Sequence, residues 1–87
     1  MANKIVSIPP NTIVDLTAAA ALVSTNSYTI QAQGSDIYLD EQAAPPSDQA
    51  ASLFIVSNSL QGITQGGTDN FYVFAKQGCK IVIAEVA

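Results

Sequence analysis

The chain has 87 residues, the length of one small domain, and 48% of them are hydrophobic, which is enough for a folded core. Only 11% are charged, against ~25% in an average soluble domain, and the net charge is −4 with three Lys, no Arg and no His. This charge balance excludes a basic stripe for nucleic acid and argues against docking on anionic membranes. From the length we expect a single domain, 1–87.

The first quarter of the chain predicts two strands and a connector. Residues 4–8 and 12–16 are rich in β-branched and apolar residues, and Pro9-Pro10-Asn11 separates them because proline cannot donate to a β-ladder. Residues 17–23 are rich in alanine but shorter than a self-supporting helix. We therefore expect an extended or single-turn connector there, with Thr17 as its cap.

The next two segments alternate in the manner of half-buried strands. Residues 28–33 and 37–42 flank the turn-forming Gly34-Ser35-Asp36, so the sequence predicts a hairpin over 28–42. The side chains expected on the buried faces are Tyr28, Ile30, Ala32, Ile37 and Leu39.

A proline corner, residues 44–51, precedes the most apolar run of the chain. Ser47 is a good cap for one helical turn after Pro45-Pro46. Residues 53–56, LFIV, predict a strand buried on both faces. A short strand is expected at 60–64, and Gly66-Gly67 suits positive φ angles.

The end of the chain predicts a second hairpin. Residues 71–75 and 80–86 are strand-like, and Gly78 is the expected bend between them. Seven to eight short strands at this spacing, with turns between them, indicate an all-β fold. We expect a small antiparallel β-sandwich, of which a jelly roll is one form, or a small barrel.

The acidic residues are the only candidate metal ligands that the sequence groups together. Asp36, Asp40, Glu41 and Asp48 lie close in sequence and offer oxygen ligands for Ca²⁺. Asp36 and Asp40 are ~13 Å apart along a strand, however, and no EF-hand pattern is present. A charged edge that discourages unwanted strand pairing is the preferred interpretation, so we expect no metal and no cofactor.

Cysteine and histidine usage argues against catalysis. Cys79 is the single cysteine, which excludes an internal disulfide, and the lack of histidine excludes an ordinary zinc site and the usual base for a nucleophile. A carboxylate pair for glycoside hydrolysis lacks a cleft in so short a chain. We expect Cys79 to be a small buried residue and the protein not to be an enzyme.

The polar residues are mostly uncharged. Ser, Thr, Asn and Gln supply 26 residues, and burying such a surface desolvates no ion. This favours a protein with much of its surface against copies of itself or a larger assembly; the alternative is a polar surface with no binding role. Among the aromatic residues, most of which belong in the core, Tyr38 is the best candidate for an exposed one.

Four segments give the chain a resemblance to known proteins. LTAAAAL (16–22), YTIQAQGSDIYLDE (28–41), APPSDQAASL (44–53) and NFYVFAKQGCKIVIAEVA (70–87) resemble the small β-sandwich virion proteins of tailed bacteriophages, of the capsid decoration or cement type. The resemblance covers most of the chain and concerns turns and apolar alternation. It implies a structural role, a homotrimer, contact with a major capsid or other virion protein, and location in the virion after synthesis in the host cytoplasm.

The predicted function is therefore non-enzymatic stabilisation of a shell through protein–protein contacts. The interface is expected at the leader (Ala2, Asn3, Lys4 and Ile5), at the proline corner (Ala44, Pro45, Pro46, Ser47 and Gln49) and at Tyr38. The alternative is a carbohydrate- or receptor-binding module of a tail or fibre, which predicts exposed aromatic side chains beside Asp36 and Asp40.

Overall fold

A computed structural model describes residues 3–44 and 53–86 of the chain. They form eight strands and one short helix, arranged as two four-stranded antiparallel sheets. The elements are β1 (Lys4–Ile8), β2 (Thr12–Asp15), α1 (Leu16–Ala19), β3 (Ser27–Gln33), β4 (Ile37–Gln42), β5 (Leu53–Ile55), β6 (Leu60–Thr64), β7 (Asn70–Ala75) and β8 (Cys79–Val86).

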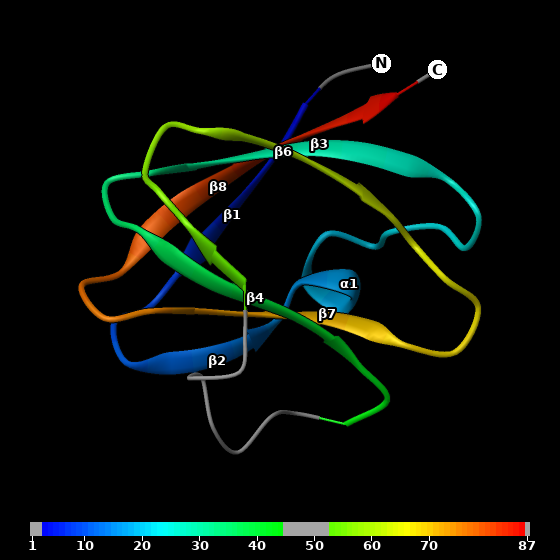
Figure 1. The fold of residues 1–87 in the computed structure, drawn as a ribbon, viewed down its shortest axis with the longest axis horizontal. Helices are drawn as coiled ribbons and strands as arrows, with labels where there is room; N and C mark the ends of the chain where they lie inside the picture. Colours follow the sequence, from blue (N-terminus) through cyan, green and yellow to red (C-terminus); the bar gives the residue numbers. More distant parts are fainter. Residues whose placement is uncertain (1–2, 45–52, 87) are drawn as a thin grey trace.

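The strand order is that of a jelly roll. Sheet A has the order β1-β8-β3-β6 and sheet B the order β2-β7-β4-β5. β1 thus pairs with β8, β2 with β7, β3 with β6 and β4 with β5. This pairing folds one long antiparallel ribbon into two packed sheets. In Figure 1, β3 and β6 run across the top and β7 and β2 across the bottom. The expected all-β sandwich is confirmed.

Both predicted hairpins are wrong. β3 lies in sheet A and β4 in sheet B, and β7 and β8 are divided in the same way. The turns at Gly34 and Gly78 therefore carry the chain from one sheet to the other. In this winding, consecutive strands share a sheet only at β4 and β5, which pair over Ile37 to Leu39.

The prediction that residues 53–56 are buried on both faces is also wrong. β5 is one of the two edge strands of sheet B and has only three residues, so it has one neighbouring strand in the sheet. Ile55 is buried, but Leu53, Phe54 and Val56 are 65%, 54% and 55% exposed. An apolar run shows that a segment is hydrophobic, but it does not place the segment inside a sheet.

The alanine-rich segment contains a single helical turn, in agreement with one of the two expected forms. Asp15, not Thr17, is the N-cap of α1, and its carboxylate accepts a hydrogen bond from the backbone N–H of Ala18 at 3.1 Å.

The expectation that Gly66 and Gly67 have positive φ angles is not met, because the glycines with positive φ are Gly34 and Gly78. No helix among the described residues is long and apolar enough to span a membrane.

The core lies between the two sheets and follows the predicted alternation. Alternate residues of β3 are buried, as are Ile37 and Leu39 of β4. The largest fully buried side chains are Leu16, Ile30, Ile37, Ile81, Ile83 and Val73. This placement fixes the outward side of each sheet, because the residues between the buried ones must point away from the core.

Candidate functional site

The outward side of sheet A is almost free of charge. In β3, Thr29 and Gln31 alternate with buried residues, and the strand register carries the same outward side across the whole sheet. We call this surface the neutral face; its residues are Ile5, Ser7, Ser27, Thr29, Gln31, Gln33, Leu60, Gly62, Thr64, Lys80, Val82, Ala84 and Val86. Lys80 is the one charged residue among them.

Apolar side chains reach the solvent on the neutral face. Ile5, Leu60 and Val86 are 66%, 72% and 53% exposed. Ile5 and Leu60 belong to one cross-strand row, Ile5–Val82–Gln31–Leu60, that runs from one edge of the sheet to the other. Such a row can pack against another protein surface, because it offers exposed apolar area and contains no ion that would have to be desolvated.

Four polar side chains of the neutral face, Ser27, Thr64, Gln31 and Gln33, are already paired within the chain. The hydroxyls of Ser27 and Thr64 lie 2.9 Å apart, and Gln33 Nε2 donates to Gln31 Oε1 at 2.9 Å. Gln31 Nε2 in turn donates to the backbone oxygen of Asn58 at 2.9 Å. Because these groups have partners, covering the face removes few unsatisfied donors or acceptors from water.

The carboxylates of the described residues lie elsewhere, and several hold local structure. Asp15 caps α1 and also accepts from Asn70 Nδ2 at 2.8 Å. Glu85 accepts from Asn26 Nδ2 at 2.9 Å, and Gln42 donates to the carboxylate of Asp40. Within residues 3–44 and 53–86, the negative charges are therefore kept off the neutral face.

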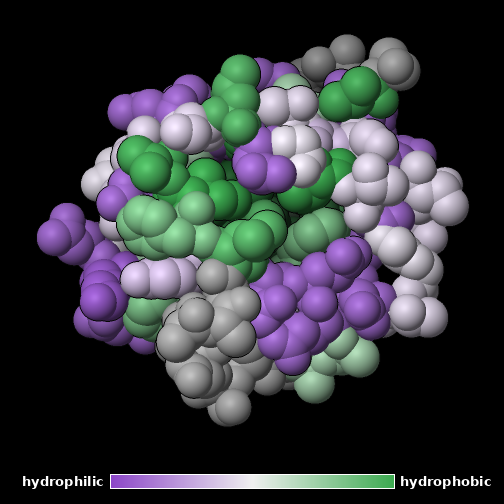
Figure 2. Space-filling view, in the orientation of Figure 1, coloured by the Kyte–Doolittle hydropathy of each residue, from purple (hydrophilic) through white to green (hydrophobic). Residues whose placement is uncertain are grey.

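A second surface is the open side of the sandwich, where the edge strands β5 and β6 have no further neighbour within their sheets. A cavity of about 480 Å³ lies there, and its lining includes apolar Leu39, Leu53, Ile63 and Phe71 together with acidic Asp40 and Glu41. Figure 2 shows apolar side chains gathered in the middle of this side, with hydrophilic ones around them.

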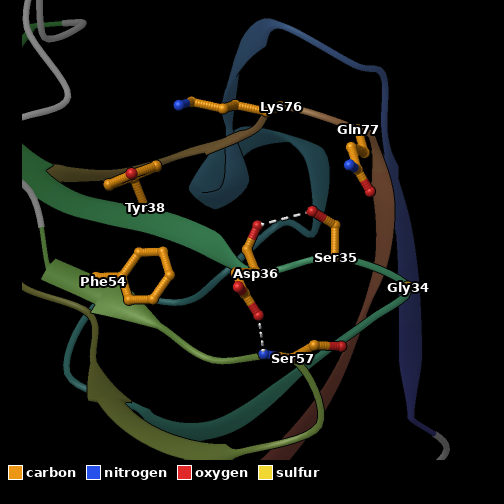
Figure 3. Close-up of a pocket in the computed structure, with 8 residues that line it drawn as sticks. All are labelled: Gly34, Ser35, Asp36, Tyr38, Phe54, Ser57, Lys76 and Gln77. Carbon is orange, nitrogen blue, oxygen red and sulfur yellow. Dashed lines mark hydrogen bonds between the residues drawn. The ribbon is translucent and has the colours of Figure 1, made fainter.

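A third surface, which we call the aromatic pocket, lies on the outward side of sheet B. It is also about 480 Å³ in volume, and its walls include Asp36, Tyr38, Phe54, Ser57, Lys76 and Gln77 (Figure 3). Tyr38 pairs in register with Phe54 on one side and Phe74 on the other. The structure thus places Tyr38, which is half-buried, at the centre of an outward row of aromatic side chains.

The structure separates the predicted interface residues. Ile5 lies on the neutral face, and Asn3 beside it is exposed. Lys4 points the other way, and its Nζ donates to the backbone oxygen of Ala20 at 2.6 Å. The strand that contains Lys4 and Ile5 pairs with β8 of its own chain, so this segment is an edge strand of sheet A and not a free arm.

The remaining predicted interface residues do not join Ile5. Tyr38 is on sheet B, and Ala44 is exposed just beyond the end of β4. Figure 1 shows the start of β1 and the end of β4 on opposite sides of the molecule. Ala2, Pro45, Pro46, Ser47 and Gln49 lie outside the described residues. The described members of the predicted interface thus lie on different surfaces, and their role in an interface stays a prediction.

The acidic run does not form a metal centre within the described residues, where no group of three or more His, Cys, Asp or Glu side chains comes together. Asp36 instead accepts a hydrogen bond from the backbone N–H of Ser57 at 2.7 Å, which ties the β3–β4 turn to the β5–β6 connection. Glu41 is exposed, Asp40 is half-buried and Asp48 lies outside the described residues.

Cys79 is half-buried and packs against the core cluster, close to the buried position expected for it. Burial raises the pKa of its thiol above the usual value of 9.0, which lowers the thiolate fraction at neutral pH. A thiol of this kind is a poor nucleophile.

The neutral face and the aromatic pocket were not identified from the sequence as surfaces. Alternation showed that Thr29, Gln31 and Gln33 point outward, but the order of the strands decides which residues lie beside them.

Comparisons with protein-family models, with curated protein sequences and with solved structures find no match to this chain.

Proposed function

We propose that this chain is a non-enzymatic structural protein that assembles through the neutral face, as a decoration or cement protein of a virion. The observation that carries this proposal is the composition of that face: exposed Ile5, Leu60 and Val86, uncharged Ser, Thr and Gln side chains of which four are internally paired, and one lysine. Such a surface gains from being covered and loses little hydration in the process.

The occupant of the neutral face is another copy of the same chain. The molecule carries a net charge of −4, so copies repel one another wherever their carboxylates face each other. Contact through the neutral face keeps those carboxylates apart and needs no complementary cluster of basic residues on the partner. Self-association is therefore the least opposed contact for this surface, and three copies is the number implied by the resemblance.

The virion setting rests on two supports. The jelly roll is a fold used by viral capsid proteins, and the sequence resembles phage decoration proteins. Because one fold hosts many functions, these supports concern the setting and not the mechanism. In this setting the chain is made in the host cytoplasm and ends in the virion, where a major capsid protein is the second partner.

Sedimentation of the purified chain tests the mechanism. We expect the wild type to have a mass that is a multiple of the chain mass, and the pair Ile5→Glu with Leu60→Glu to weaken association about 100-fold or more, because each carboxylate is buried without a partner. The control pair, Val23→Glu with Leu53→Glu, adds the same charge at side chains of similar exposure away from the neutral face.

The control pair should associate as the wild type does. A wild type that stays monomeric at millimolar concentration contradicts the proposal, as does equal dissociation of the two variant pairs. Electron microscopy of particles carrying the tagged chain tests the virion setting separately.

A further inference from the structure

The aromatic pocket has features that self-assembly through the neutral face does not use. It lies on the opposite sheet, at the end of the sandwich where three connections meet. Asp36 comes from the β3–β4 turn, Ser57 from the β5–β6 connection, and Lys76 and Gln77 from the β7–β8 turn. Its volume of about 480 Å³ lies within the range of ~300–1,000 Å³ that small-molecule sites occupy.

One wall of the pocket is aromatic. Tyr38 and Phe54 have ring centroids 5.3 Å apart at an interplanar angle of 60°, and Phe74 supports Tyr38 from the other side at 6.3 Å. Phe54 is 54% exposed at an outward position of a strand. A polar residue is expected at such a position, so an exposed aromatic ring there is unusual. The negatively polarised face of such a ring attracts C–H groups, which line one side of many pyranose rings.

The opposite side of the pocket is polar and partly fixed in position. The backbone N–H of Ser57 donates to Asp36 Oδ1 at 2.7 Å, so the carboxylate is held in place. Among the described residues, this bond leaves Asp36 Oδ2 available to accept from a ligand. Figure 3 shows Lys76 above Tyr38 and Gln77 above Ser35, and their ammonium and amide groups supply hydrogen-bond donors.

These features select one class of ligand. An anion such as a phosphate is disfavoured by Asp36 and by the net charge of −4. A wholly apolar ligand would bury Asp36 and Lys76 without partners, which is unfavourable. A neutral sugar satisfies both walls, because its hydroxyls donate to a carboxylate and accept from an ammonium while its C–H face covers an aromatic ring.

We propose that the aromatic pocket is a binding site for a neutral saccharide. The pyranose ring lies against Phe54 and Tyr38, and a hydroxyl donates to Asp36 Oδ2. Lys76 and Gln77 donate to the remaining ring substituents. The site holds a single sugar unit at the end of a glycan, since its aromatic wall has only two rings and three connections supply the rest of its lining.

Titration of the full ¹⁵N-labelled chain by NMR tests the site. The probes are the methyl glycosides of D-glucose, D-galactose, L-rhamnose and N-acetyl-D-glucosamine, each raised to 50 mM, with glucose 6-phosphate as the anionic comparison. We expect at least one neutral glycoside to give saturable shifts confined to the amides around residues 34–38, 54–57 and 76–78. Glucose 6-phosphate should bind at least tenfold more weakly than that sugar.

Two variants separate the two walls. Phe54→Ala should weaken binding at least tenfold, and Leu53→Ala, at an exposed side chain of the same strand, should leave it unchanged. Asp36→Asn keeps an oxygen for Ser57 N–H but removes the carboxylate, and should also weaken binding at least tenfold. Asp69→Asn is its control. The spectrum of each variant shows whether the fold is kept.

Three results would overturn the saccharide site: shifts that remain linear with every neutral glycoside, binding that survives both Phe54→Ala and Asp36→Asn, or preference for the phosphorylated sugar. None of these results bears on the mass of the wild type in solution, so failure of this site is distinguishable from failure of the assembly proposal.

Discussion

Gly78 shows how a single residue decides a connection between the sheets. Its φ of +75° lies in the left-handed region, which residues other than glycine rarely adopt. An added Cβ would also lie 3.0 Å from the backbone oxygen of Ile8 and 3.1 Å from Pro10 Cδ. The β7–β8 turn is therefore packed directly against the β1–β2 turn, and only glycine fits between them.

Replacing Gly78 by Ala should destabilise the fold by about 2 kcal/mol or more, because backbone strain adds to a contact that the rigid neighbouring turn cannot relieve. Urea unfolding followed by circular dichroism measures the change. Gly67→Ala is the matched control: its φ is ordinary and its Cβ would meet only Ser24 Oγ at 3.8 Å. A control as unstable as Gly78→Ala would contradict the argument.

At the scale of elements, a partly buried hydrogen-bond network ties α1 to the β6–β7 connection and to β7. The hydroxyl of Thr17 donates to Gln65 Oε1 at 2.7 Å and accepts from the backbone N–H of Phe71 at 2.9 Å. Gln65 is 4% exposed, and its amide also donates to the backbone oxygen of Asp69 at 2.6 Å. One threonine thus joins α1, the β6–β7 connection and the start of β7.

Thr17→Val should lower the free energy of unfolding by about 2 kcal/mol, because it keeps the shape but leaves Gln65 Oε1 and Phe71 N–H without their partner. Thr12→Val removes an exposed hydroxyl that donates only to the oxygen of Pro10, and should change stability by less than about 0.5 kcal/mol. Thermal and urea unfolding of both variants provide the comparison. Equal stability of the two would show that the network contributes little.

At the scale of the whole molecule, charge is divided unevenly between surfaces. The described carboxylates lie outside the neutral face, while Asp15, Asp36, Asp40 and Lys76 lie on or beside the outward side of sheet B. Assembly through the neutral face therefore gains little from ion pairs. Salt acts mainly on the repulsion between the negative copies, which it screens.

The association constant of the wild type should accordingly remain unchanged or rise slightly between 50 mM and 1 M NaCl. Sedimentation at several salt concentrations measures this directly. An interface built on ion pairs would behave in the opposite way, since screening would weaken it. Dissociation on raising the salt would therefore contradict assembly through the neutral face.

The strands were largely predictable because each depends on a local pattern. Residues 28–33 alternate so clearly that their buried side chains were correctly assigned, and the strands at 4–8 and 60–64 begin and end where expected. The hairpins were not predictable, because Gly34 and Gly78 suit a turn within one sheet as well as a crossing between two. β5 was placed too deep for a related reason: hydrophobicity does not reveal whether a strand has one neighbour or two.

By itself the sequence determined an all-β chain of short strands, the core-facing side of residues 28–33 and 37–42, and a surface poor in ions. Those properties follow from alternation, turn residues and composition, which are local. Only the tertiary structure decided that β1, β8, β3 and β6 lie side by side, which assembles one neutral face from four distant segments, and that three turns meet around Tyr38 and Phe54. Strand order is set by how the whole ribbon closes over its core, and no single segment contains that information.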